Sequence, residues 1–188
     1  MTYGAIVLCG GASSRMGAPK ALLPWRGTTM IEHVVGVLSD CVAEVVVVSS
    51  PDLKLPPLPK SVRIFHDTEP GRGPLAGLRD GLHAIAADLA FVTSTDAPFL
   101  TAPFIRKMLS FDCAAAPEID GFLQPLAAVY PKALSSMATA LLAVPRNGLT
   151  DLLKAAHARR VLPAELPDLK SLETFNTSEE YQSALDQS

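Results

Sequence analysis

The chain has 188 residues, 48% of them apolar and 19% charged, and this length and composition predict a single globular domain over residues 1–188. The formal net charge of −3 and the absence of any Lys/Arg run argue against a nucleic-acid partner, because the phosphate backbone of DNA or RNA is bound by an extended basic surface. There is no signal-peptide pattern and no apolar run near the ~20 residues that cross a bilayer, so we expect a cytoplasmic protein without membrane contact.

Strand and helix patterns alternate over the first half of the chain. Apolar runs rich in β-branched residues predict strands at 3–9, 44–50, 62–67 and 89–96. Helical periodicity predicts three helices, which begin after Thr29 (in a capping box with Glu32), over residues 73–87, and after Thr101. The proline-rich stretch 51–60 predicts a surface connector between the second and third strands.

The pattern changes in the second half of the chain. Asp120-Gly121 stands between two apolar segments and predicts a β-hairpin, where an antiparallel strand could join a parallel sheet. Helical stretches follow at 131–144 and 149–158, and a capping box at 177–180 predicts a C-terminal helix. This order of elements predicts an α/β fold, a three-layer open, mostly parallel twisted sheet with an antiparallel hairpin addition.

A glycine-rich, cationic loop follows the first predicted strand. Residues 8–23 read "LCGGASSRMGAPKALL", in which Gly10 and Gly11 let the backbone approach a ligand while Arg15 and Lys20 add positive charge. A guanidinium fork and a mobile ammonium suit the oxygens of a polyphosphate. The stretch matches neither the Walker loop nor the dinucleotide fingerprint. The residues alone therefore leave two interpretations, a phosphate-binding loop or a glycine-rich turn with two exposed cations.

Two more segments are expected at the same edge of the sheet. Ligands of open α/β sheets bind outside the carboxyl ends of the strands, so the loops after Cys9, His66 and Thr95 should converge. Asp96 could hold Mg²⁺ beside a triphosphate, cap the next segment, or pair with a cation. The glycines of "GRGPLAGL" at 71–78 place backbone amides at a helix start, which favours an anion or simply permits close helix packing.

The cysteines and histidines carry weaker signals. Cys9, Cys41 and Cys113 have no metal-ligand spacing, so they are expected to be small hydrophobes in a reducing compartment. Cys9 adjoins the loop, which leaves a reactive thiol as its alternative interpretation. The histidines are expected to have structural roles, and Trp25 is expected to cover the core.

The motifs taken together resemble a known family. "LCGGASSRMGAPKALLPWRG", "DTEPGRGPLAGL", "TSTDAPFL", "QPLAAVY" and "NTSEEY" occur in the order typical of the molybdenum cofactor guanylyltransferases, a MobA-like branch of the nucleotidyltransferases. The resemblance implies a Rossmann-like nucleotidyltransferase fold. It also implies transfer of GMP from GTP to the phosphate of molybdopterin or Mo-molybdopterin, with Mg²⁺ as cofactor, pyrophosphate as product, and transient contact with other cofactor-biosynthesis proteins.

The same resemblance assigns roles by position. Arg15, Lys20 and Asp96 would be catalytic, and Asp96 would be the metal ligand. The nucleotide would be bound by Leu8, Cys9, Gly10, Gly11, Lys20, Asp67, Gly73, Pro74, Leu75, Ala76, Gly77 and Asp96. The chain departs from the family where Cys9 replaces a usual Ala and in "TFNTSEE", which keeps Asn176 but leaves a ligand role for this segment open.

Two other functions remain possible at this point. The first is a related nucleotidyltransferase that uses CTP or a sugar-phosphate acceptor. The second is a non-catalytic nucleotide-binding homologue, which the altered C-terminal motif suggests and the retained Lys20, Arg15 and Asp96 argue against.

Overall fold

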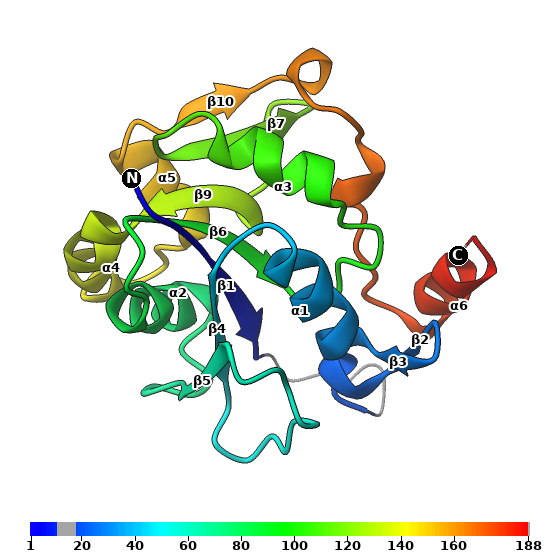
Figure 1. The fold of residues 1–188 in the computed structure, drawn as a ribbon. Coiled ribbons are helices and arrows are strands. Elements are labelled where there is room, and N and C mark those ends of the chain that lie inside the picture. Colours follow the sequence, from blue (N-terminus) through cyan, green and yellow to red (C-terminus); the bar gives the residue numbers. More distant parts are fainter. Residues whose placement is uncertain (11–17, 188) are drawn as a thin grey trace.

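A central sheet covered by helices on both faces forms the body of the molecule (Figure 1). The computed structural model describes residues 1–10 and 18–187. The strands are β1 (Tyr3–Cys9), β2 (Pro24–Trp25), β3 (Thr28–Thr29), β4 (Glu44–Ser49), β5 (Val62–His66), β6 (Leu89–Ser94), β7 (Ala115–Ile119), β8 (Phe122–Leu123), β9 (Ala127–Pro131) and β10 (Arg159–Val161). The helices are α1 (Met30–Ser39), α2 (Pro74–Ala84), α3 (Ala102–Leu109), α4 (Ser135–Leu142), α5 (Leu149–Ala155) and α6 (Ser178–Asp186).

The sheet has the mixed topology that the sequence predicts. Its strand order is β10-β7-β9-β6-β1-β4-β5, and β8 pairs with β7 beside this path. Strand β1 lies in the centre and pairs in parallel with both β4 and β6. The predicted hairpin joins β7 to β8 through Asp120 and Gly121, which both have positive φ, and β9 runs antiparallel to β6. The predicted α/β fold with a mostly parallel sheet is therefore confirmed.

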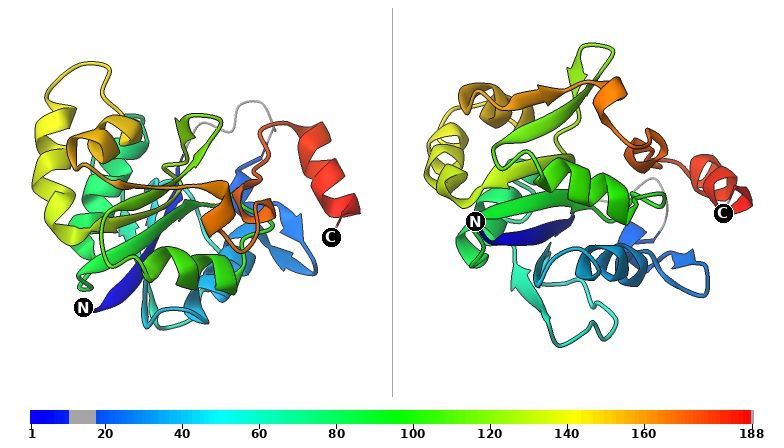
Figure 2. Two further views of the ribbon diagram at one scale, coloured as in Figure 1. Left: turned by 90° about the horizontal axis from the view of Figure 1, so that it is seen from above. Right: turned by 45° about the horizontal axis from the view of Figure 1, so that its top comes forward.

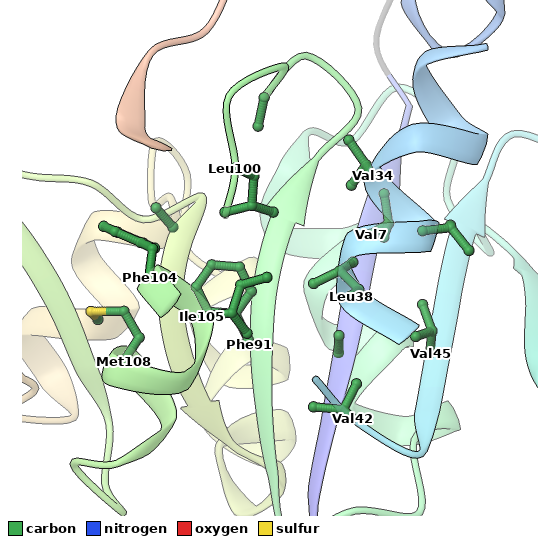
Figure 3. Close-up of a cluster of buried hydrophobic side chains, with 14 of the residues drawn as sticks. Val7, Val34, Leu38, Val42, Val45, Phe91, Leu100, Phe104, Ile105 and Met108 are labelled. Carbon is green, nitrogen blue, oxygen red and sulfur yellow. The ribbon is translucent and has the colours of Figure 1, made fainter. Parts of the chain in front are cut away.

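The apolar strand runs are unbroken because both faces of the sheet are covered. Along β1, Ile6 and Leu8 belong to the core beneath α2, α4 and α5, whereas Val7 and Cys9 belong to the core beneath α1 and α3. Figure 2 shows the helices on opposite sides of the sheet, and Figure 3 shows Leu38 of α1 among the side chains that fill one interface. The three predicted layers follow from this alternation.

Helix α2 packs against β1 through glycines that face the sheet. Gly81 faces Ile6, and a Cβ at this position would lie 2.7 Å from the Cγ2 atom of Ile6. One turn earlier, a Cβ at Gly77 would lie 3.5 Å from Cδ2 of Leu8, which is ordinary contact. Gly81 therefore sets how near α2 can come to β1, and with it the position of the loop that leads into α2.

Several local predictions hold at the level of single residues. Thr29 and Glu32 form the predicted reciprocal capping box of α1, and Thr177 and Glu180 form that of α6. The side chain of Thr101 accepts a hydrogen bond from the backbone N–H of Phe104 at the start of α3. These caps are local in sequence, which is why the pattern alone reveals them.

Three features of the fold differ from the sequence-based expectation or were not anticipated. Residues 51–60 form the predicted connector without helix or strand, but its partly buried Leu53, Leu55 and Leu58 pack against the core, which was not anticipated. A small hairpin joins β2 to β3 and buries Trp25, and β10 adds an edge strand beside β7. Within the described residues, no helix has the length and apolar character needed to cross a membrane.

Candidate active site

The candidate site lies at the carboxyl ends of the central parallel strands. Strands β1 and β6 are parallel neighbours in the sheet, so the loops that follow them leave the same edge. Open α/β sheets bind ligands outside this edge. A cavity of about 180 Å³ opens there. Its described lining consists of Leu8, Cys9, Gly10, Pro19, Lys20, Ala21, Leu53, Ser94, Thr95 and Asp96.

Lys20 and Asp96 meet at this cavity. Lys20 begins a short 3₁₀ turn that follows the glycine-rich loop, and its Nζ lies 2.6 Å from Oδ2 of Asp96. The two side chains retain 20% and 16% of their exposure, so they are shielded but still accessible to a ligand. The other carboxylate oxygen of Asp96, Oδ1, accepts a hydrogen bond from the hydroxyl of Ser94. The structure thus brings the cationic turn and the acid after the fourth parallel strand to one place.

The C-terminal segment also reaches Lys20. The Nζ atom donates to the backbone carbonyl of Phe175 at 2.6 Å and to Oδ1 of Asn176 at 3.1 Å, and it lies 5.5 Å from the centroid of the Phe175 ring. Phe175 is buried against Tyr181 of α6, whose hydroxyl donates to the carbonyl of Pro24. The altered "TFNTSEE" motif therefore contacts the candidate site through Lys20, although it does not line the cavity. In the sequence, the retained Asn176 directly before the capping box of α6 was the one signal that this segment could reach Lys20.

Asp67 and the start of α2 follow β5 in the chain and lie at the same edge of the sheet as the cavity. The backbone N–H of Asp67 donates to the carbonyl of Ser49 at 2.8 Å, and Oδ1 of Asp67 accepts from the N–H of Glu69 at 2.9 Å. Gly73 has a φ of 92° and caps the N-terminus of α2, which continues with Pro74, Leu75, Ala76 and Gly77. As far as the described residues go, neither Asp67 nor these α2 residues line the cavity.

Two predicted site residues, Gly11 and Arg15, lie outside the described residues. Leu8, Cys9 and Gly10 do line the cavity. Burial raises the pKa of the Cys9 thiol to about 12, so this group is a protonated, buried hydrophobe at neutral pH. That environment argues against the alternative of a reactive thiol at Cys9.

His33, Gln124 and Trp25 have structural contacts. His33 contacts the carbonyl of Pro98 through Nε2 at 2.9 Å, and burial lowers its pKa, which favours the neutral ring. Gln124 binds its own hairpin, since its Nε2 donates to the carbonyl of Phe122 at 3.2 Å. Trp25 is fully buried and packs against His33 and Phe99, as expected for a core residue.

The described residues contain no cluster of three or more His, Cys, Asp or Glu side chains that could hold a metal ion by themselves. Asp96 offers hard carboxylate oxygens at the cavity. Mg²⁺ usually binds one or two carboxylates and completes its shell with water and substrate phosphates. The single carboxylate of Asp96 fits a divalent cation that arrives with a triphosphate, and it does not fit a cation held by protein side chains alone.

Comparison with known proteins identifies relatives of this chain. The profile of the MobA-like NTP transferase domain matches residues 5–161. The chain is 35% identical over 189 residues to a Bacillus cereus protein named "Probable molybdenum cofactor guanylyltransferase", covering 95% of this chain and 94% of that protein. A Mycobacterium bovis protein with the same name is 38% identical over 169 residues, covering 85% and 83% of the two chains.

Solved structures share the fold at lower sequence identity. The Archaeoglobus fulgidus molybdopterin-guanine dinucleotide biosynthesis protein A superposes with a TM-score of 0.80 at 19% identity, covering 98% of this chain and 97% of that one. The 2-C-methyl-D-erythritol 4-phosphate cytidylyltransferase of Thermus thermophilus gives a TM-score of 0.74 at 18% identity, with 97% of both chains covered. The profile match over most of its length and its curated relatives show that this chain belongs to the MobA-like NTP transferase family.

Proposed function

We propose that this protein transfers GMP from GTP to the terminal phosphate of molybdopterin or Mo-molybdopterin. The products are a molybdopterin guanine dinucleotide and pyrophosphate. The observation that carries the proposal is the pairing of Lys20 with Asp96 in a cavity at the carboxyl ends of β1 and β6. The names of the two curated relatives support the choice of guanylyl transfer to a molybdenum cofactor.

The reaction makes small demands on acid–base chemistry. An oxygen of the acceptor phosphate attacks the α-phosphorus of GTP, a new P–O bond forms, and the bond from the α-phosphorus to the bridging oxygen breaks. The electron pair of that bond leaves with pyrophosphate. A phosphate monoester has a second pKa of about 6, so the attacking oxygen is already ionised near neutral pH and needs no base.

The protein contributes alignment of two anions and neutralisation of their charge. Lys20 would leave Asp96 for a phosphate oxygen of the bound nucleotide, and Arg15 would add a second cation. Mg²⁺ would be held by Asp96 and would supply further charge neutralisation on the triphosphate. Cys9 and the glycines Gly10 and Gly11 would present backbone groups to the nucleotide.

The nucleoside half of GTP would lie toward β5 and α2. Asp67 would contact the nucleoside, and residues 73–77 would pack near it at the N-terminus of α2, where amides and the helix dipole favour polar and anionic groups. We also propose that residues 1–188 act as one domain in the cytoplasm. Contacts with other cofactor-biosynthesis proteins would be transient.

A pyrophosphate-release assay with molybdopterin as acceptor tests the proposal. GTP, CTP, UTP and ATP are compared at equal concentration with Mg²⁺, and the melting temperature is followed with each nucleotide in parallel. A nucleotide at a hundredfold excess over its Kd stabilises the native state by ~2.7 kcal/mol. We expect release and stabilisation with GTP. Release with CTP, or with a sugar phosphate as acceptor, would replace the proposal by a related transferase activity, and binding without any release would indicate a non-catalytic homologue.

A further inference from the structure

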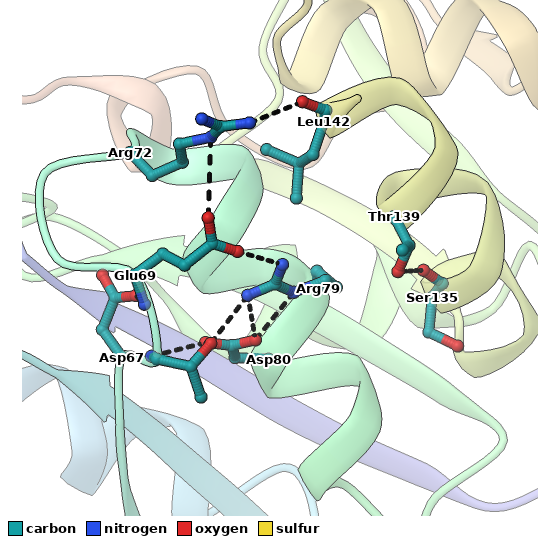
Figure 4. Close-up of polar contacts among 9 residues, drawn as sticks. Asp67, Glu69, Arg72, Arg79, Asp80, Ser135, Thr139 and Leu142 are labelled. Carbon is teal, nitrogen blue, oxygen red and sulfur yellow. Dashed lines mark hydrogen bonds and ion pairs between the residues drawn. The ribbon is translucent and has the colours of Figure 1, made fainter. Parts of the chain in front are cut away.

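The loop between β5 and α2 is held by a buried carboxylate that has no place in the reaction described above. Asp80 lies in α2 and is 4% exposed. Its Oδ2 accepts two hydrogen bonds from Thr68, one from the backbone N–H at 2.8 Å and one from the hydroxyl at 2.7 Å (Figure 4). Thr68 directly follows Asp67, so Asp80 fixes the backbone next to the proposed nucleoside ligand.

Arg79 completes the same network from the neighbouring position of α2. Its guanidinium pairs with Oδ1 of Asp80 at 2.7 Å and with Oε1 of Glu69 at 2.6 Å, and its Nη2 donates to the hydroxyl of Thr68 at 2.7 Å. The hydroxyl of Thr68 therefore donates to Asp80 and accepts from Arg79. Both carboxylate oxygens of Asp80 therefore accept hydrogen bonds. Hydrogen bonds and ion pairs also connect the three consecutive loop residues 67–69 to one another and to α2.

The carboxylate of Asp67 depends on this arrangement. Its Oδ1 accepts a hydrogen bond from the backbone N–H of Glu69, so its orientation follows the path of the backbone through Thr68. The other end of the loop is also fastened, because Arg72 donates to the carbonyl of Leu142 on α4 at 2.7 Å. Figure 4 shows these contacts on one side of α2, with Asp67 beside them.

Stability alone does not explain why this network is built from charged groups. Burial alone would raise the pKa of Asp80, but hydrogen bonds from Thr68 and the guanidinium of Arg79 outweigh burial and hold the pKa below its ordinary value. Buried ion pairs of this kind seldom stabilise more than apolar residues of similar size, because both charges lose their hydration. They do restrict a segment to one geometry, which matters where a ligand must be recognised.

We propose that Asp80, together with Arg79, is a positioning residue that sets the 67–69 turn so that the carboxylate of Asp67 meets the nucleoside of the donor nucleotide. This inference rests on the proposed function. Asp80 itself does not touch the nucleotide. Its effect is transmitted through Thr68, so it should alter binding and discrimination among nucleotides rather than the chemical step.

The first test compares Thr68→Val with Thr68→Ser. Valine keeps the shape of threonine but removes the hydroxyl that joins Asp80 to Arg79, whereas serine retains it. We expect Thr68→Val to raise KM for GTP about 5- to 10-fold with kcat unchanged, because the hydroxyl loses its hydrogen bonds to Asp80 and Arg79, and to narrow the preference for GTP over ATP. Thr68→Ser should restore both values. Arg159→Gln, which breaks an exposed ion pair with Glu165 far along the chain, serves as a stability control.

The second test asks whether Asp80 acts through Asp67. Asp80→Asn is expected to raise the Kd of a fluorescent GTP analogue about 10- to 100-fold, as expected when a charged hydrogen-bond acceptor is lost. In an Asp67→Ala background the same change should have no further effect on Kd or on the ratio of GTP to ATP binding. Asp80→Asn and Thr68→Val both leave the volume of the site nearly unchanged, so at least one folded variant should be obtained.

The outcomes separate this inference from the proposed function. If the unaltered protein releases pyrophosphate with GTP and the Asp67→Ala variant loses nucleotide selectivity, the proposed function stands and the Asp80 variants decide the inference. The positioning role would be overturned if Asp80→Asn weakened GTP binding equally in the unaltered protein and in the Asp67→Ala background. It would also be overturned if the loss of binding only followed a lower melting temperature of the variant, with the ratio of GTP to ATP binding unchanged. Unchanged selectivity in Asp67→Ala would overturn it as well, and absence of GTP turnover in the unaltered protein would instead overturn the proposed function.

Discussion

The ammonium of Lys20 and the carboxylate of Asp96 stand 76 positions apart in the sequence and lie 2.6 Å apart in the lining of the cavity. Both side chains are largely buried, so the attraction between the two charges is offset by the loss of their hydration, and the pair is weak evidence for stability. The pair instead holds two opposite charges next to each other at the proposed nucleotide site. Each charge can then be matched to a different part of a metal–triphosphate complex.

Asp96→Asn should separate nucleotide binding from turnover. The substitution removes the negative charge beside Lys20, so GTP binding measured without Mg²⁺ is expected to be as tight as in the unaltered protein or tighter. Turnover with Mg²⁺ should fall by about 100-fold or more, because stabilisation of the transferred charge is lost. Isothermal calorimetry and pyrophosphate release measure the two effects, with the exposed Asp186→Asn as control. Unaltered turnover would contradict the role of Asp96 as the metal ligand.

Lys20→Met should produce the complementary defect. Methionine keeps the length of the side chain but cannot donate to a phosphate oxygen, so the Kd for GTP is expected to rise about 10- to 100-fold, as for the loss of a hydrogen bond to a charged group. Lys154→Ala on α5 is the matched control, because this lysine is exposed and lies away from the cavity. Equal GTP affinity in Lys20→Met and the unaltered protein would contradict the phosphate-binding role.

Asn176→Ala tests the contribution of the C-terminal segment. Lys20 would lose one of its acceptors, and its ammonium would be less well oriented toward the phosphates. We expect kcat/KM for GTP to fall about 5- to 10-fold, in line with ~1–1.5 kcal/mol for one hydrogen bond. Gln182→Ala is the control, since it removes an exposed amide of α6 that donates to Asp186, and it should leave kcat/KM unchanged. An equal loss in both variants would show that the defect comes from α6 as a whole.

Two glycines in helices should respond in opposite directions to the same substitution. Gly81→Ala would place its Cβ 2.7 Å from Ile6, and overpacking of this kind costs about 1–3 kcal/mol. Gly36 in α1 has no neighbour within 4 Å of a Cβ, and Gly36→Ala should stabilise by about 0.5–1 kcal/mol through its helix propensity. Urea unfolding of both variants measures the difference. A gain in stability for Gly81→Ala would show that α2 can move away from β1.

The depressed pKa of Asp80 predicts a dependence of stability on pH. A carboxyl with a lower pKa in the folded state contributes stability that is present above its unfolded pKa, near 3.8, and is lost as pH falls through the folded pKa. The free energy of unfolding should therefore fall less steeply below about pH 4 in Asp80→Asn than in the unaltered protein. Urea titrations at several pH values, compared as differences between the two proteins, provide the measurement. Parallel curves would show that Asp80 has no such linkage.

The sequence predicted those parts of the molecule that have local signals. The central strands appear as apolar runs because they are covered on both faces, and the capping boxes at Thr29 and Thr177 lie within one helical turn. Strand β10 was missed, since it is three residues long and two of these are exposed arginines. Residues 159–161 are a strand because they pair with β7, and no local sequence pattern indicates this pairing.

The same distinction applies to the site. The order of strands predicts that the loops after Cys9 and Thr95 share an edge, and the structure places Lys20 and Asp96 there. The contact between Lys20 and Asn176 joins positions 156 apart, and it is created by the packing of Phe175 and α6. Leu53 reaches the cavity from a proline-rich connector without strand or helix pattern. Contacts that arise from tertiary packing leave no periodicity in the sequence.

The reach of Lys20 to Phe175 and Asn176 has a consequence for synthesis of the protein. Lys20 is synthesised early in translation. Two of the oxygen atoms that accept hydrogen bonds from its ammonium belong to residues 155 and 156 positions later in the chain. A nascent chain can thus pair its inner strands well before this lysine acquires its final neighbours. These contacts of Lys20 can form only after Phe175 and Asn176 have been translated, and a chain that ends before Phe175 would lack them.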